Sequence, residues 1–392
     1  MENILTMPLS DMPGLTFDCA CGQRHSFPVK HLSIRSGAVD DLPAMAEPFR
    51  SGTIVVVFDS NTYPVAGEKA VARLKDAGFA VKELLFNCGD DILLPDEKTL
   101  GRILMEVDKD TTLIVAVGSG VLNDSVKFVT SRCHLPYIIV ATAPSMDGYV
   151  SDGAPIICEG YKYSPQAHLT YGLVGDTDAL QTAPQELVAA GYGDVVGKIT
   201  ALADWDLAKK VVGEHYCETS VQLVQKALDK CFAEAAGLPR RKPEALEALM
   251  EALTITGVAM ALLNISRPAS GAEHMISHHW EMAYIARGLN PIHHGIQVGV
   301  ATVLIARFFE ELSDVLPAGV AALCPSHEEI ENLLRLGGAP VSPVEIGIDR
   351  ELFHRSMLES YTVRPRYSVM RFAMEQGRLE AIADKLTTEY YG

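Results

Sequence analysis

Histidines gathered in one short stretch are the residues of this sequence best suited to metal chemistry. Five of its 12 histidines fall between positions 274 and 294. His274 and His278 are four residues apart in a segment that reads as helix, so both project from one face and can serve a single site. His293 and His294 open the next helix, and a hairpin of the two helices would bring them close. A lone histidine is more often a solvated or hydrogen-bonded structural residue, but this clustering favours a metal site.

Asp194 is the carboxylate that would complete such a site. It follows a glycine in the helical segment Gly-Tyr-Gly193-Asp194, and glycine permits close approach of another backbone where it otherwise costs stability. Neutral imidazoles suit zinc, iron or nickel, and a catalytic site commonly has three protein ligands with one position open for substrate. The sequence therefore predicts a metal site built from Asp194 and imidazoles of both helices. Glu273 points elsewhere on its helix from His274 and is interpreted as structural.

Two glycines stand where a buried strand gives way to a helix, at Gly118 and Gly120. Glycine lets the backbone approach a pyrophosphate, and the free N–H groups of a helix start bind its charge. Position 123 is Asn instead of the third glycine of the dinucleotide fingerprint. The loop by itself therefore fits either a phosphate loop or an ordinary strand-to-helix turn.

Small hydroxyl side chains follow the next strand, at Thr142, Ser145 and Ser151. The carboxyl ends of strands are where open α/β sheets hold ligands, which supports a nucleotide site here. Asp147 precedes a glycine and also fits a simple turn. Asp59, at the end of an earlier strand, would either accept hydrogen bonds from an adenosine ribose or cap the turn that follows.

The elements that must position these residues fall into two halves. From residue 53, apolar runs alternate with amphipathic segments, which is typical of an α/β layer with a mostly parallel sheet. After about residue 176 the strand-like runs give way to long segments of helical periodicity. We predict domains at residues 1–176 and 177–392. The expected strands are 53–59, 80–86, 113–117, 137–141 and 168–174, and the expected helices are 67–77, 95–107, 121–131, 184–207, 217–236, 244–263, 272–287 and 295–312.

The first 45 residues or so read as irregular and contain one further group of metal-binding residue types. Cys19, Cys21 and His25 resemble half of a zinc knuckle. A closed structural zinc site needs four ligands, and only three are close in the sequence. The segment is therefore predicted to be an ordinary strand and turn.

Composition narrows the class of protein. A chain of 392 residues with 48% hydrophobic and 21% charged residues can bury a large core, and its longest apolar runs are too short to span a bilayer. The net charge of -17 and the lack of a long Lys/Arg cluster disfavour nucleic acid as a partner. No secretory signal is recognisable, so a cytoplasmic protein is expected. The eight scattered cysteines are then expected to be free thiols.

The motifs together resemble those of the sn-glycerol-1-phosphate dehydrogenases. Their segments, in the family's order between about residues 53 and 310, are Gly118-Ser-Gly120 with Asn123-Asp124, Ser145-Met-Asp-Gly-Tyr149, Gly193-Asp194, Glu273-His274-Met-Ile-Ser-His278 and His294-Gly295. The family belongs to a superfamily with glycerol dehydrogenase, iron-containing alcohol dehydrogenases and dehydroquinate synthase. The resemblance implies an N-terminal Rossmann-like α/β domain with a mostly parallel sheet, an all-α C-terminal domain, and an active site in the cleft between them. The Cys19 segment and the tail beyond about residue 330 look like the longer bacterial members.

The resemblance also implies a role for each matching residue. Asp194, His274 and His294 would hold one divalent metal, with zinc favoured and nickel as the alternative. Asp147 and His278 would contact substrate as catalytic residues, and Asp194 would border the same substrate site. NAD(H) or NADP(H) would contact Gly118, Ser119, Gly120, Val121, Leu122, Thr142, Ala143, Pro144, Ser145 and Ser151, with Asp59 as a candidate at the ribose.

The implied reaction is the reversible, metal-dependent reduction of dihydroxyacetone phosphate to sn-glycerol-1-phosphate by NAD(P)H. His278, one helical turn from a ligand, would orient the substrate hydroxyl or pass a proton. The cation that binds the phosphate stays open among Lys127, Lys198, Arg287 and others. The alternatives are a glycerol dehydrogenase acting on unphosphorylated glycerol or dihydroxyacetone, and a lyase similar to dehydroquinate synthase. The family also implies a homodimer.

Overall fold

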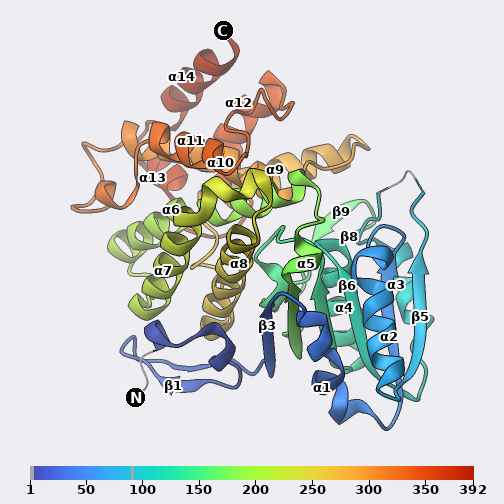
Figure 1. The fold of residues 1–392 in the computed structure, drawn as a ribbon. Coiled ribbons are helices and arrows are strands. Elements are labelled where there is room, and N and C mark those ends of the chain that lie inside the picture. Colours follow the sequence, from blue (N-terminus) through green and yellow to red (C-terminus); the bar gives the residue numbers. More distant parts are fainter. Residues whose placement is uncertain (1–3, 90–91) are drawn as a thin grey trace.

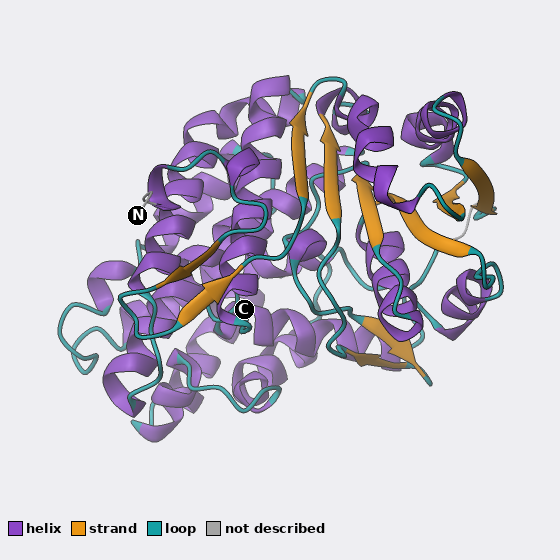
Figure 2. Cartoon of the chain, turned by 90° about the horizontal axis from the view of Figure 1, so that it is seen from below, coloured by secondary structure: helices purple, strands orange, loops and turns teal. Residues whose placement is uncertain are grey.

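The chain folds into a sheet layered with helices and an adjoining body made of helices alone (Figure 1). The computed structural model describes residues 4–89 and 92–392. Seen from below, the strands of the main sheet gather on one side of the molecule and long helices fill the other (Figure 2). The predicted fold class, a mostly parallel α/β layer followed by an all-helical part, is confirmed.

The main sheet has six strands, all parallel, in the order β3-β10-β7-β6-β4-β5. Each of the five predicted strands is present, although the last begins later than expected. The edge strand β3 lies in a segment predicted to be irregular, because only Leu32 of its five residues is fully buried and no apolar run marks it. The strands are β3 (His31–Arg35), β4 (Thr53–Asp59), β5 (Ala80–Phe86), β6 (Thr111–Gly118), β7 (Tyr137–Ala141) and β10 (Gly172–Asp176).

Helices cover both faces of this sheet because the side chains of its central strands alternate between two buried surfaces. Val56 of β4 packs in the same hydrophobic cluster as α1 and α2, whereas its neighbour Val57 packs with α3 and α4. These helices are α1 (Leu42–Ala46), α2 (Glu68–Asp76), α3 (Glu97–Leu104) and α4 (Gly120–Cys133).

The strand order reverses between β4 and β6. From β4 the chain moves outward to β5, and it then returns to the other side of β4 to form β6 and β7. Val57 pairs with Ala116, so the ends of β4 and β6, at Asp59 and Gly118, meet at one edge of the sheet. In open α/β sheets the crevice outside such a reversal is where ligands bind.

After Asp176 the described chain contains helices and no strand, as predicted. The long helix α6 is buried along most of its length and packs alongside α10. The helices are α5 (Thr177–Leu180), α6 (Gln185–Val212), α7 (Glu218–Glu234), α8 (Pro243–Leu263), α9 (Ala272–Ala286), α10 (His294–Glu311), α11 (His327–Leu336), α12 (Arg350–Glu359), α13 (Val369–Glu375) and α14 (Leu379–Tyr391). The predicted boundary between residues 176 and 177 stays a prediction.

One helix, α8, is long and apolar enough to cross a membrane by length and composition. Within its most apolar window 72% is buried against the rest of the protein. Because its apolar side chains are already covered by neighbouring helices, α8 has the character of a core helix.

Two small antiparallel hairpins stand outside the main sheet. The first joins β1 (Thr16–Asp18) to β2 (Arg24–Ser26), and the second joins β8 (Ile156–Cys158) to β9 (Tyr161–Tyr163). Figure 1 shows the first hairpin beside the lower ends of α7 and α8, apart from the main sheet. The predicted strand and turn around Cys19 is therefore present, within a segment otherwise expected to be irregular.

Candidate active site

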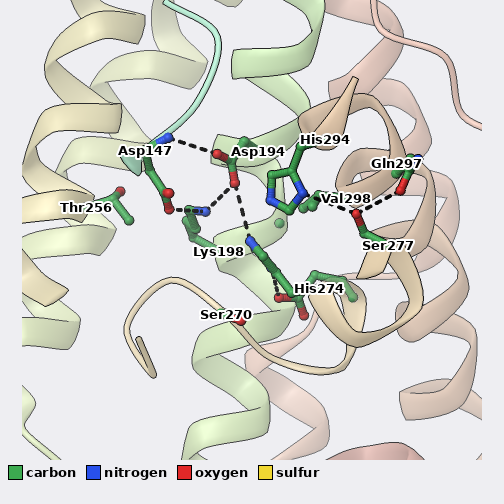
Figure 3. A network of polar contacts seen from close by, with 12 residues as sticks. Asp147, Asp194, Lys198, Thr256, Ser270, His274, Ser277, His294, Gln297 and Val298 are labelled. Carbon is green, nitrogen blue, oxygen red and sulfur yellow. Dashed lines mark hydrogen bonds and ion pairs between the residues drawn. The ribbon is translucent and has the colours of Figure 1, made fainter. Parts of the chain in front are cut away.

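Three side chains from three different helices meet at one point (Figure 3). Asp194 comes from α6, His274 from α9 and His294 from α10. One ligand atom from each lies within 4.8 Å of the other two, and His274 Nε2 is 3.6 Å from Asp194 Oδ1. Within the described residues, the sequence-predicted carboxylate and imidazoles are thus brought together in space.

Glycines allow α6 and α10 to come this close. A methyl group added to Gly193 would lie 2.2 Å from the carbonyl oxygen of Gly295, and one added to Gly295 would lie 1.8 Å from that of Ala190. Both distances are far inside van der Waals contact. The two helices can therefore cross at this point only without side chains there, and the crossing places Asp194 next to His294.

Glu273 fixes the orientation of His274. Its Oε1 lies 2.7 Å from His274 Nδ1 and also accepts the Gly271 N–H at 2.6 Å, while its Oε2 accepts the Thr200 hydroxyl at 3.0 Å. A hydrogen on Nδ1 leaves the lone pair of Nε2 directed at Asp194. The interpretation of Glu273 as pointing away from the site is wrong. Neighbours in a helix do not normally face each other, but the carboxylate here folds back over the first turn of α9.

Ser277 and Gln297 orient His294 in the same way. The Ser277 hydroxyl donates to Gln297 Oε1 at 3.1 Å and lies 3.3 Å from His294 Nδ1. Gln297 in turn donates to the carbonyl of Ile292. This chain of donors assigns a hydrogen to Nδ1 of His294, so its Nε2 also keeps a free lone pair. The sequence contained no signal for either supporting residue.

Lys198 joins the two aspartates of the site. Its Nζ lies 2.6 Å from Asp194 Oδ1 and 2.7 Å from Asp147 Oδ2, and the Asp147 N–H donates to Asp194 Oδ2 at 3.0 Å. Lys198 and Asp194 both have completely buried side chains. Lys198 follows Asp194 by four residues on α6, a spacing that could have identified this pair.

The charges of this group are strongly perturbed. Burial opposes the charged form of Asp194, but Lys198 and the two imidazoles hold its pKa well below the usual range. Burial likewise opposes the charge of Lys198, and Asp147 and Asp194 nevertheless raise its pKa. The pKa of His294 is lowered well below its usual value, first by burial and then by Lys162 and His274. The site therefore presents a carboxylate and a neutral imidazole at neutral pH.

This donor set fits a divalent cation. Hydrogens on both Nδ1 atoms leave His274 and His294 as acceptors toward the carboxylate of Asp194, and acceptors that face one another need a positive charge among them. Two imidazoles and one carboxylate are a common catalytic ligand set for zinc, and the same residue types suit iron and nickel. In the described structure Lys198 supplies such a charge, and although burial opposes the charged form of His274, Asp194 and Glu273 raise its pKa.

His278 lies beside the cluster without joining it. Its ring centroid is 5.6 Å from that of His294 and 6.4 Å from that of His274. Its Nε2 lies 3.0 Å from a guanidinium nitrogen of Arg364, in the segment that precedes α13. Burial, followed by the nearby charges of Lys162 and Arg364, lowers the pKa of His278 well below its usual value. His278 is therefore a neutral acceptor toward Arg364.

Arg364 is a cation without an acidic partner among the described residues. Across residues 4–89 and 92–392, no carboxylate lies within ion-pair distance of Arg364, and burial lowers its pKa. The other candidates are already engaged. Lys127 donates to the carbonyls of Gly148 and Gly153, and Arg287 pairs with Asp349 at the surface. Arg364 was not singled out from the sequence, because nothing in its local segment distinguishes it from other arginines.

The loop at Gly118, between β6 and α4, lies where the strand order of the sheet reverses. Ser119 is the N-cap of α4, and Ser119, Gly120 and Val121 are partly exposed, while Gly118 and Leu122 are buried. A methyl group on Gly118 would lie 2.5 Å from the side chain of Leu122. The start of α4 thus offers free backbone N–H groups at the edge where a nucleotide is expected.

The loop after β7 runs beside that helix start. Thr142, Ala143, Pro144 and Ser145 are buried, and the Gly191 Cα hydrogens face the carbonyl of Pro144 so closely that a methyl group would lie 1.7 Å from it. The Ser151 hydroxyl donates to the Gly148 carbonyl at 3.1 Å. The loop therefore connects the edge of the sheet to Asp147 and, through α6, to Asp194.

Asp59 adopts the capping arrangement. Its Oδ1 accepts the N–H groups of Asn61 and Thr62 at 2.9 and 2.8 Å. Of the two roles expected for Asp59, the structure therefore shows the turn cap. Contact with a ribose stays a prediction, to which the position of Asp59 beside Gly118 is suited.

Comparison with known proteins identifies the family. Residues 33–184 match the iron-containing alcohol dehydrogenase family. The curated glycerol-1-phosphate dehydrogenase (NAD(P)+) of Bacillus licheniformis is 32% identical, with 94% of each chain covered. This chain belongs to the glycerol-1-phosphate dehydrogenase family. Members from Bacillus subtilis (34% identical; 90% of this chain and 92% of the relative) and Methanosarcina mazei (30%; 85% and 87%) match over most of their length as well.

Solved structures share the fold of this family member at lower identity. The glycerol dehydrogenase of Schizosaccharomyces pombe superposes with a TM-score of 0.66 at 18% identity, covering 91% of this chain and 90% of that one. The NADH-dependent butanol dehydrogenase A of Thermotoga maritima also has a TM-score of 0.66, at 17% identity, with 95% and 98% covered. The fold is therefore common to dehydrogenases that act on different alcohols.

Proposed function

We propose that this protein is an NAD(P)H-dependent oxidoreductase that reduces dihydroxyacetone phosphate to sn-glycerol-1-phosphate and catalyses the reverse reaction. The names of its curated relatives and the arrangement of the site support this function. The observation that carries the phosphorylated substrate is Arg364, a cation that contacts His278 and has no acidic partner within the part of the chain that the structure describes. An unphosphorylated triose would leave that partly buried guanidinium without an anionic partner.

Asp194, His274 and His294 are the residues that would hold the divalent metal, zinc first and nickel as the alternative. The bound cation would supply Lewis acidity to the ketone oxygen, and the nicotinamide would supply the hydride. The chain's own part is to set the tautomer of His274, because Glu273 accepts the hydrogen of its Nδ1, and to keep His294 neutral by burial. Asp147, held by Lys198, borders the substrate position.

His278 and Arg364 would act as a pair on the substrate. In the structure Arg364 donates to Nε2 of His278. When the guanidinium turns to a phosphate, Nε2 becomes free to accept a hydrogen bond from a substrate hydroxyl and to pass its proton. Reduction of the ketone adds one hydride at carbon and one proton at oxygen, and in this proposal His278 would relay that proton.

The dinucleotide would lie along the edge where β4, β6 and β7 end. Gly118 through Leu122 would bind its phosphates through backbone N–H groups, and Thr142 through Ser145, with Ser151, would line the nicotinamide side. A carboxylate at Asp59 would repel a 2′-phosphate, so NADH is expected to be preferred over NADPH. Cytoplasmic location and a homodimer also stay predictions.

A direct assay tests the proposed function. Purified protein is given dihydroxyacetone phosphate or dihydroxyacetone at equal concentration, with NADH and NADPH in turn, and the chirality of the product is determined. Reduction of the phosphorylated ketone to the sn-1 product supports the proposal. Equal or greater activity on dihydroxyacetone would favour a glycerol dehydrogenase. A substrate turned over without net change in nicotinamide absorbance would favour a lyase.

The Arg364→Gln variant tests the phosphate assignment. We expect a KM for dihydroxyacetone phosphate raised by about 10- to 100-fold, because a charge-assisted contact of about 1.5–3 kcal/mol is lost. The KM for any residual reaction of dihydroxyacetone should not change. Arg355→Gln, on the exposed side of α12, is the matched control. Equal changes of KM for both ketones would contradict the assignment.

A further inference from the structure

A second group of metal-binding side chains lies outside the active site. Cys19, Cys21 and His25 of the β1–β2 hairpin meet Cys217, the residue that precedes α7. One ligand atom from each of the four lies within 4.8 Å of all the others. His25 and Cys217 are buried and the other two are partly buried. The missing fourth ligand of the zinc knuckle therefore comes from a residue 192 positions after His25.

The distances within this group match a tetrahedral site. Cys19 Sγ lies 3.7 Å from Cys217 Sγ, and His25 Nε2 lies 3.3 Å from Cys21 Sγ and 3.6 Å from Cys217 Sγ. Zinc at its usual bond lengths would separate two sulfur ligands by about 3.8 Å and a sulfur from a nitrogen by about 3.5 Å. Three of the six distances between donor atoms are thus close to the spacing that the ion requires, and all six are within 4.8 Å.

His25 is oriented for coordination by its other nitrogen. Its Nδ1 lies 2.8 Å from the carbonyl of Leu262, near the end of α8, and that carbonyl can only accept. The hydrogen is therefore on Nδ1, and the lone pair of Nε2 faces the sulfurs. The hydroxyl of Thr219 lies 3.4 Å from Cys19 Sγ, where it can donate to a thiolate. These contacts are the supporting interactions that metal ligands in proteins usually have.

We propose that Cys19, Cys21, His25 and Cys217 bind a structural zinc ion that fastens the N-terminal hairpin to helices α7 and α8. Three thiolates and one imidazole leave no open coordination position, which distinguishes this site from the three-ligand group at Asp194. The two groups share no residue. Closing a loop between His25 and Cys217 through a metal would stabilise the fold mainly by restricting the unfolded chain.

A disulfide is the competing explanation for part of this group. Cys19 and Cys217 are close enough to approach each other, but their 3.7 Å separation is nearly twice a bonded S–S distance of about 2.05 Å. A disulfide would also give no reason for Cys21 and His25 to converge on the same point. The arrangement of all four donors favours a cation.

Metal analysis of variants separates the two sites. The His274→Ala protein, purified under reducing conditions without added metal, should retain one zinc per chain. Adding Cys217→Ser or Cys19→Ser to that variant should remove it, whereas adding Cys158→Ser, an exposed cysteine outside the group, should not. Zinc absent from His274→Ala, or retained after both group substitutions, would overturn the proposal. These outcomes do not depend on whether the protein reduces any ketone.

Cobalt substitution gives a readout that does not require a variant to fold. Wild-type protein refilled with Co²⁺ should show a thiolate-to-cobalt charge-transfer band in the near ultraviolet and strong visible bands of tetrahedral cobalt. Asp194 and its two histidines contain no sulfur and cannot produce the first band. Its absence, or a Cys19 to Cys217 disulfide found by peptide mapping of alkylated protein, would refute the zinc site.

Discussion

At the scale of single residues, the position of a hydrogen on each imidazole decides what the site can bind. Glu273 and Ser277 hold the Nδ1 hydrogens of His274 and His294, so both Nε2 lone pairs are directed toward the carboxylate of Asp194. His278 is held differently, since Arg364 donates to its Nε2. Three histidines of one cluster therefore have two distinct chemical environments, a pair suited to a metal and a single one suited to substrate.

Replacing His274 by Ala should remove tightly bound metal from the active site and lower turnover by at least about 100-fold, because a ligand is lost from the cation that activates the ketone. Metal content and initial rates on the same preparation measure both effects. His293→Ala is the matched control, since His293 is exposed and adjacent to a ligand. Full activity in the His274→Ala protein would refute the metal assignment.

At the scale of elements, the site depends on how closely two helices cross. α6 and α10 meet at Gly193 and Gly295, where any side chain would collide with backbone. A second approach, of Gly191 to the carbonyl of Pro144, joins α6 to the loop after β7. Each glycine costs helix stability, and that cost is offset by packing that brings the proposed metal ligands next to the edge of the sheet proposed to bind the nucleotide.

Gly193→Ala should force α6 and α10 apart and lower the free energy of unfolding by about 1–3 kcal/mol. Metal affinity should fall as well, because Asp194 moves relative to His294. Chemical denaturation and metal titration measure the two effects. Gly101→Ala is the control, since its added methyl group meets nothing within 4 Å in the middle of α3, and should raise stability slightly. An unchanged free energy of unfolding in Gly193→Ala would contradict the conclusion that α6 and α10 can cross here only without side chains.

At the scale of the whole molecule, buried acidic groups connect elements far apart in the sequence. Asp204 of α6 accepts the Ala272 N–H at the start of α9 at 2.8 Å and the Val369 N–H at the start of α13 at 2.6 Å. Burial, together with the nearby charge of Glu273, raises the pKa of Asp204 to about 7. The helical body is thus held together by a carboxyl group that titrates near neutral pH.

The pKa of Asp204 in the folded protein is about 7, above its ordinary value of 3.8. The protonated carboxyl therefore contributes its full stabilisation below pH 3.8, and this contribution is lost as the pH rises to about 7. The difference in unfolding free energy between wild type and Asp204→Asn should therefore shift against wild type by at most about 1.4 kcal/mol per pH unit over that range. Chemical denaturation of both proteins between mildly acidic and neutral pH measures this difference, with a chelator present to remove bound metal. A difference independent of pH would show that Asp204 does not titrate in this range.

The sequence by itself determined the parts of this protein that depend on local pattern. Apolar periodicity located the five predicted strands and the long helices, since burial on one face or both leaves a regular repeat along the chain. Residue type and short spacing identified Asp194, the histidines and the Gly118 loop as candidates. The sequence could not predict β3, because only one of the five residues of this strand, Leu32, is buried.

Only the tertiary structure decided which distant residues become neighbours. Arg364 and His278 are 86 positions apart, and Cys217 lies 192 positions from His25. No periodicity or motif connects such pairs, because their contact results from the packing of whole elements, and the energy that brings them together is spread over the core. For the same reason, helical spacing alone places Glu273 on the wrong side of its helix. In the structure the first turn of α9 packs against α6, where Glu273 contacts both Thr200 and His274.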